Sequence, residues 1–175
     1  MSAESISNAL FLIAAVICAA VLIVAIFPAI YTMTGTFGSA SHAADQNIRT
    51  DFKIVTVTNN GQTVLVWMKN VGTAQIPLAD ISRSDVFWGE VEGNFDRLTY
   101  IPNPNNQYNS GNPPPSGDWT ATLNDINGNN YWDSGETLGV IGTTSTNHQI
   151  TGTTDLYFQF VLPNGISRST QFAPS

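Results

Sequence analysis

The sequence of 175 residues has few cysteines, few histidines and few charged residues. Charged side chains make up 11% of the chain, the six lysines and arginines are spread thinly, and the formal net charge is −7. Nucleic acids bind through clustered positive charge, so this composition excludes them as partners. The single cysteine, Cys18, lies within an apolar run, which leaves the remainder of the chain without disulfide bonds.

The residues that usually carry catalysis are also scarce. His42 and His148 occur in no metal-ligating or nucleophile motif in the sequence. Two acidic pairs are interpreted as solvated turn residues, namely Glu90 with Glu92 and Asp80 with Asp85. We therefore predict that the protein is not an enzyme.

An uncharged apolar run, residues 9–31, dominates the N-terminal part of the chain. As a helix it would cross a hydrocarbon core of ~30 Å, and its large aliphatic side chains and Phe favour insertion by on the order of 4 to 8 kcal/mol. Residues 1–8 lack the lysine or arginine that opens a secretory signal peptide, so we expect a retained transmembrane or filament-core helix. Residues 32–48 are small and polar, and they either extend this helix or form a stalk.

Small side chains recur four residues apart within the apolar run. Ala14 and Cys18 form one such pair, and Ala15 and Ala19 form another on an adjoining strip. Small residues at this spacing allow membrane helices to approach closely, so these four positions are candidate helix-packing residues. The alternative is that alanine is only filler in a lone anchor.

Residues 49–175 are mainly β in character. Asn59-Asn60-Gly61 separates two runs rich in β-branched residues, which predicts a hairpin between residues 51–58 and 62–70. Short apolar runs continue at regular spacing and predict a β-sandwich. The other predicted strands are residues 75–81, 84–88, 95–101, 119–123, 137–143, 156–162 and 166–172. Residues 102–118, rich in Pro, Asn and Gly, are predicted to form a long exposed loop.

Residues 125–136 have the register of a calcium-binding loop of the EF-hand type. Oxygen-bearing residues occupy loop positions one, three, five, seven, nine and twelve, and these are Asp125, Asn127, Asn129, Tyr131 (through its backbone carbonyl), Asp133 and Glu136. Position six is Asn130 where glycine is usual, and asparagine tolerates the left-handed conformation required there. We predict a structural Ca²⁺ site, and the alternative is a β-turn with incidental carboxylates.

Several segments resemble the archaellum accessory proteins F and G, and G more closely. The resemblance lies in the apolar helix, in residues 66–98 and in the ending VLPNGIS of residues 161–167. Its most specific parts are Lys69-Asn70-Val71-Gly72-Thr73, Ser84-Asp85-Val86-Phe87 and the PNGIS turn. The loops at 102–118 and 125–136 lie between these parts and look like insertions.

This resemblance implies a membrane helix followed by an immunoglobulin-like sandwich between the archaeal cell membrane and the S-layer. The implied role is that of a stator, which fixes the archaellum motor to the cell envelope and associates with itself, with other archaellum subunits and with the S-layer protein. The close alternative is an archaellin or type IV pilin subunit in an extracellular filament. A more distant alternative is a membrane-tethered binding module or hydrolase.

Overall fold

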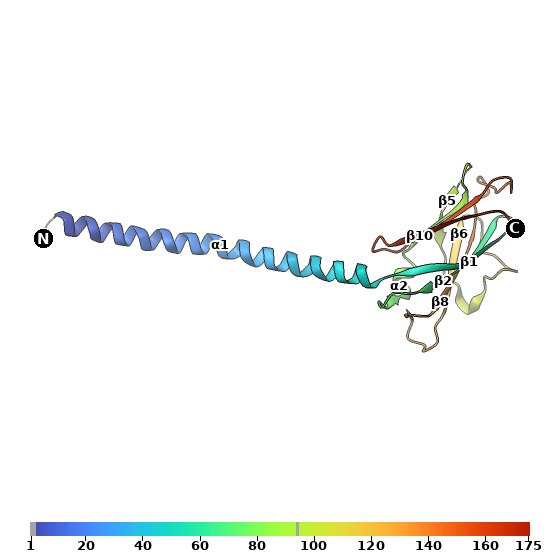
Figure 1. Cartoon of the computed structure of the whole chain (residues 1–175), viewed down its shortest axis with the longest axis horizontal. Helices are drawn as coiled ribbons and strands as arrows, with labels where there is room; N and C mark the ends of the chain where they lie inside the picture. The colour runs from blue at the N-terminus through green and yellow to red at the C-terminus, as the bar shows by residue number, and fades with distance from the viewer. Residues whose placement is uncertain (1–2, 94) are drawn as a thin grey trace. The chain divides into compact units, whose positions relative to one another are not determined.

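The computed structural model describes residues 3–93 and 95–175. The chain divides into two units, Met1–Asp45 and Gln46–Ser175. One long helix, α1 (Ala3–Arg49), is followed by a β-rich domain (Figure 1). The predicted order of an apolar helix and then a β domain is therefore confirmed.

Helix α1 combines the apolar run with the small polar segment after it. None of its described residues is buried, and it is long and apolar enough to cross a membrane. In the polar segment, the hydroxyls of Thr32, Thr34, Thr36 and Ser39 donate to backbone carbonyls three or four residues earlier. These internal bonds satisfy the hydroxyl donors without a partner outside the helix.

The β-rich domain contains ten strands and two short helical turns within the described residues. In chain order these are β1 (Phe52–Asn60), β2 (Thr63–Asn70), β3 (Ile76–Pro77), α2 (Leu78–Ile81), β4 (Asp85–Glu90), β5 (Phe95–Tyr100), η1 (Pro104–Asn106), β6 (Asp118–Asn124), β7 (Tyr131–Trp132), β8 (Thr137–Thr143), β9 (Leu156–Val161) and β10 (Ser167–Phe172).

Eight strands hydrogen-bond in the order β1-β2-β8-β6-β5-β4-β9-β10, and all neighbours are antiparallel except β5 and β6. The strands fold into two layers, because Phe52 of β1 and Trp119 of β6 both pack edge-on against Phe160 of β9. The short parallel pair β5–β6 joins the layers. The predicted sandwich is thus confirmed, with its two sheets continuous through this one junction.

Alternation along the strands builds the core between the layers. Val64, Val66 and Met68 of β2 point inward and are fully buried, as are Phe158 and Phe160 of β9. Burying side chains of this size contributes about 1.5 to 3 kcal/mol each. The core is therefore large enough to hold the domain together without a disulfide bond.

The predicted hairpin is confirmed, with Asn60 opposite Thr63 and Gly61 at a φ of 56° in the turn. The predicted strand at 75–81 is wrong in its second half, where Leu78–Ile81 is a helical turn. Only Ile76 and Pro77 pair with a partner strand, β7, and the turn that follows brings Ile81 fully into the core. Burial of one apolar side chain there outweighs strand propensity.

The Pro/Asn-rich loop is mostly exposed, as predicted. The Asn103 side-chain amide fastens it to β6 by donating to the Thr122 hydroxyl, and just before the loop the Thr120 hydroxyl donates to the Ile101 carbonyl. Pro114 is buried, although most of the other residues of the loop are exposed.

The segment Lys69-Asn70-Val71-Gly72-Thr73 closes around the end of α1. The N–H groups of residues 71 and 72 donate to the Asp51 carbonyl, and those of residues 73 and 74 donate to the Arg49 carbonyl. The buried Asn70 side chain supports this loop by accepting from the Gly72 N–H and donating to the Ala74 and Trp132 carbonyls. The segment thus satisfies carbonyls that a helix end otherwise leaves unpaired.

Candidate functional site

The loop 125–136 is organised around the Asp125 carboxylate. Its Oδ1 accepts the N–H of Gly128 at 2.7 Å and that of Asn129 at 3.3 Å, and its Oδ2 accepts the N–H of Asn130 at 2.8 Å. The bond from Asn130 is the largest influence that holds the pKa of Asp125 below its usual range. Asn130 has a φ of 61°, so the left-handed turn expected at position six is present.

Asp133 and Glu136 close the other side of the loop. The side-chain amide groups of Asn127 and Asn129 donate to Asp133 Oδ2 at 2.7 and 2.8 Å and hold the pKa of Asp133 below its usual range. The Glu136 side chain is buried and accepts the N–H groups of Ile126 and Asp133 at 2.9 and 3.0 Å. The three acids and two asparagines predicted for the site therefore share one compact loop.

The donor set suits Ca²⁺ in type but is directed toward neighbouring N–H groups. Three carboxylates, two amide oxygens and the Tyr131 carbonyl would provide the six or more oxygens that Ca²⁺ requires. In the described part of the chain, no three His, Cys, Asp or Glu side chains form a group that could hold a metal. Calcium would therefore require the Asn127 and Asn129 amides to turn their oxygens toward the ion.

The predicted helix-packing residues lie on the exposed surface of α1. Ala14, Ala15, Cys18 and Ala19 are exposed, as are the large apolar side chains around them. Because the apolar residues surround the helix, lipid or other helices can cover it on every side. The small residues remain candidates for the closest approach of a neighbouring helix.

Two acidic residues have roles that the sequence interpretation missed. The Asp96 carboxylate pairs with the ring of His148, which lies 52 residues away in the sequence. Burial raises the pKa of Asp96, but hydrogen bonds from the Ser145 N–H and from His148 outweigh it and keep this pKa below its usual range. Glu90 is buried, not solvated as predicted, and its carboxylate accepts the hydroxyl and N–H of Thr151. Both carboxylates anchor loops, Asp96 through Ser145 and His148, and Glu90 through Thr151 and Gly152.

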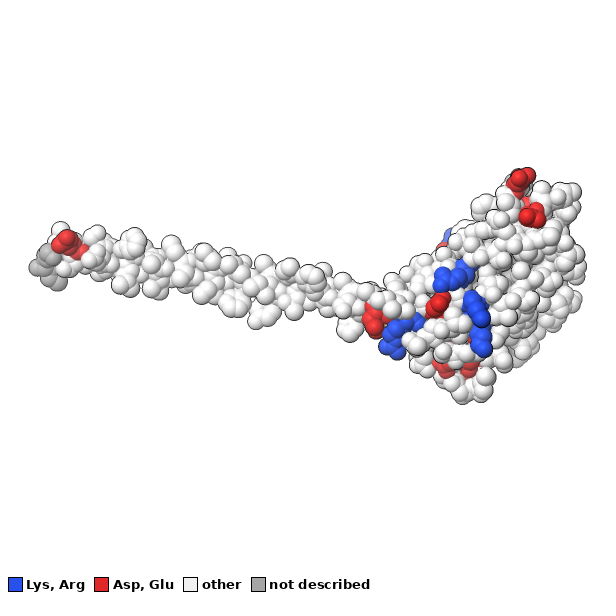
Figure 2. Space-filling view, in the orientation of Figure 1, with Lys and Arg blue, Asp and Glu red and all other residues white. Residues whose placement is uncertain are grey.

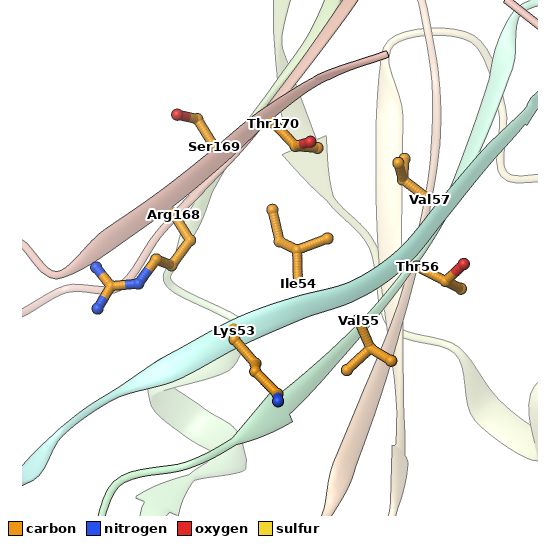
Figure 3. A pocket seen from close by; sticks show the side chains of 8 residues that line it. All are labelled: Lys53, Ile54, Val55, Thr56, Val57, Arg168, Ser169 and Thr170. Carbon is orange, nitrogen blue, oxygen red and sulfur yellow. The ribbon is translucent and has the colours of Figure 1, made fainter. Parts of the chain in front are cut away.

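A slot of about 480 Å³ opens between β1 and β10, the two end strands of the sheet (Figure 3). Ion pairing of Arg168 with Asp51 and hydrogen bonds between Ser175 and Asn59 tie the strands at the two ends. The slot lining contains no carboxylate, histidine or cysteine, and consists of Lys53, Ile54, Val55, Thr56, Val57, Arg168, Ser169 and Thr170. The lining therefore offers two cations, hydroxyl groups and apolar side chains, without a carboxylate or histidine beside the hydroxyls.

Several known proteins are similar to this chain in sequence or in fold. The sequence profile of archaeal-type flagellin matches residues 2–172. An uncharacterized protein of Archaeoglobus fulgidus is 26% identical over 177 residues, which cover 99% of each chain. The archaeal flagellum of Methanospirillum hungatei strain JF1 has the same fold, with a TM-score of 0.64 and 13% identity over 97% of this chain and 93% of that chain.

The archaellum periplasmic stator protein FlaG from Sulfolobus acidocaldarius is 25% identical, with a TM-score of 0.49 over 70% of this chain and 99% of that chain. The resemblance to archaellum proteins that the sequence predicted is confirmed at the level of the family. Since the profile extends from the start of the apolar helix to the last strand, the chain belongs to the archaeal-type flagellin family.

Proposed function

We propose that this chain is a structural, non-enzymatic component of the archaellum, in which α1 anchors a β domain held outside the cytoplasm. The role we propose is that of a stator, which links the motor to the cell envelope through contacts with itself and with the S-layer. The observation that supports an archaellum component is the family profile, which spans both the apolar helix and the β domain.

The fold suits a part that bears load. A rotary motor needs a fixed point, and insertion of residues 9–31 into a bilayer would hold one end of the chain. Four backbone hydrogen bonds join residues 71–74 to the segment where α1 ends, two to the Arg49 carbonyl and two to the Asp51 carbonyl. These bonds would carry load between residues 71–74 and the chain that leaves α1.

A filament subunit is the second candidate, and one observation favours it. Between Glu4 and Asp45 the helix carries no charge over about 60 Å, roughly twice the thickness of a hydrocarbon core. The part beyond the apolar run contains Gly35, Gly38 and several threonines, which are weak helix formers in water. Packing among other helices would stabilise this part along its whole length.

Cell fractionation with N-terminal sequencing separates the two candidates. A stator should be found in the membrane fraction with residues 1–8 intact, and its deletion should stop rotation while filaments still assemble. A filament subunit should be found in sheared filaments with a trimmed N-terminus, and its deletion should remove them. Recovery in neither fraction, with normal motility after deletion, would contradict the archaellum role.

We also propose that the loop 125–136 binds a structural Ca²⁺ ion. With a Kd of 10⁻⁴ to 10⁻³ M, as in extracellular sites, 10 mM calcium should stabilise the domain by about 1.4 to 2.7 kcal/mol. The melting temperature should rise by several degrees with calcium and not with magnesium. Glu136→Gln should abolish the rise and Glu92→Gln, at an exposed position, should keep it. An unchanged melting temperature at this concentration would rule out the site.

A further inference from the structure

Two lysines stand directly opposite each other on the outer face of the β1–β2 hairpin. Lys53 and Lys69 are register partners, and both side chains are exposed. Arg83, Arg97 and Arg168 each pair with an aspartate, whereas neither lysine has an ion-pair partner among the described residues. Like charges opposite each other destabilise a strand pair, so an anionic partner would relieve this repulsion.

Exposed apolar side chains lie beside the two lysines. Val55 is 57% exposed and lies in the β1 bulge, where its side chain points to the same side of the strand as Lys53 (Figure 3). Trp67 of β2 is 37% exposed, and its ring lies over Gly139, where a Cβ atom would come within 2.8 Å of it. We name Lys53, Val55, Trp67 and Lys69 the hairpin patch.

A complementary surface lies at the turn between β4 and β5, next to the start of β9. The Val91 N–H donates to the Asp155 carbonyl at 2.9 Å, which places Glu92 and Asp155 on adjoining segments. Neither acid has a cationic partner among the residues described here. Val91 is 41% exposed, and Phe95 is 53% exposed and contacts Tyr157. We name Val91, Glu92, Phe95 and Asp155 the acidic tip.

We propose that the acidic tip of one copy of this chain docks on the hairpin patch of another copy. The two surfaces match in kind, because two unpaired cations with exposed Val and Trp would meet two unpaired anions with exposed Val and Phe. Figure 2 shows basic side chains gathered on one part of the domain with some acidic side chains among and below them, and other acidic side chains at a separate end. The two surfaces therefore meet between copies and not within one.

The geometry of this contact determines the kind of assembly. Because the patch and the tip are different surfaces of one chain, the contact is heterologous, and its repetition adds copies in a row. A closed two-fold dimer would instead bring like surfaces together. The inference rests on the proposed structural role in the archaellum and specifies the partner surface for self-association.

Charge reversal of the full-length chain in detergent tests the contact. Lys53→Glu with Lys69→Glu, and separately Glu92→Lys with Asp155→Lys, should each weaken association more than about tenfold in sedimentation velocity. A mixture of the two double variants should associate again, since the reversed patch then meets a reversed tip. Association of the unmodified chain should also weaken as salt is raised.

The matched control reverses one charge elsewhere. Arg83→Glu makes the same change in net charge as Lys53→Glu alone but lies outside both surfaces, and it should leave association unchanged. Equal loss of association in the control and in Lys53→Glu would overturn the proposal, because net charge and not position would then be responsible. Failure of the mixed double variants to associate would overturn it as well.

Crosslinking gives a second readout that does not depend on charge. In a Cys18→Ser background, a copy with Val55→Cys and a differently tagged copy with Phe95→Cys should form a mixed disulfide on oxidation. Crosslinks mainly between copies of the same variant would show a two-fold contact and overturn the head-to-tail arrangement. If no mixed crosslink forms while the protein still fractionates with the archaellum, this inference fails and the proposed function stands.

Discussion

Gly72→Ala is the sharpest test of how the domain holds the helix end. An added Cβ would lie 2.3 Å from the Arg49 carbonyl oxygen and 2.4 Å from the Asp51 nitrogen. Both are backbone atoms, so the strain cannot be relieved by a side-chain rotation. The loop of residues 71–74 must move away, and it loses part of its four hydrogen bonds to the Arg49 and Asp51 carbonyls.

The expected cost follows from those bonds. Loss of two to four backbone hydrogen bonds, at a net value of about 1 kcal/mol each, destabilises the domain by about 2 to 4 kcal/mol. For a domain of this size the melting temperature should fall by about 10 °C. Thermal unfolding of the full chain in detergent, followed by tryptophan fluorescence, reports this directly because all four tryptophans lie in the β domain.

Gly111→Ala is the matched control. It is the same chemical change in the same domain, but the nearest atom to its added Cβ is the Asn109 Oδ1 at 3.4 Å, in an exposed loop. Its melting temperature should stay within about 1 °C of the unmodified chain. If Gly72→Ala behaves like Gly111→Ala, the close packing of this loop on the helix end is refuted.

Two further outcomes are expected. In the folded state the hydrogen bond from the Asn127 side-chain amide is the largest influence that lowers the pKa of Asp133. The ionised Asp133 therefore stabilises the fold above the unfolded pKa of about 3.9, and this stabilisation is lost as the pH falls through the lower folded pKa. The melting temperature should therefore decline below about pH 4, less steeply in Asp133→Asn, and parallel declines would contradict this cause. Ala15→Leu with Ala19→Leu should weaken association between chains in detergent, while Ala20→Leu on another helix face should not. If the unmodified chain, the double variant and Ala20→Leu associate equally, Ala15 and Ala19 are not helix-packing residues and the helix is a plain anchor.

Local patterns predicted most of the fold. Strand bounds within two residues of those observed followed from alternation and turn residues, because one face of each strand must be buried. Residues 78–81 were the exception, since Ile81 reaches the core only through a helical turn. The two-residue strand β7 was missed because it is too short for any period to show.

The candidate loop was predictable in its register but not in its internal bonds. The spacing from Asp125 to Glu136 was enough to predict that the carboxylates share one loop and that Asn130 turns left-handed. Which atoms meet depends on amide orientation and burial, so the donation of Asn127 to Asp133 could not be read from sequence. The pairing of His148 with Asp96 joins residues 52 apart, and no local pattern records it.

The sequence alone determined an uncharged apolar run long enough for a membrane helix and a hairpin-rich β domain, since each depends on neighbours along the chain. Only the tertiary structure decided the features that long-range pairing creates. It set Lys53 opposite Lys69, brought Glu92 beside Asp155, and closed Gly72 over the end of α1. Register and burial place these groups, because side chains far apart in sequence meet only after the sheets have paired.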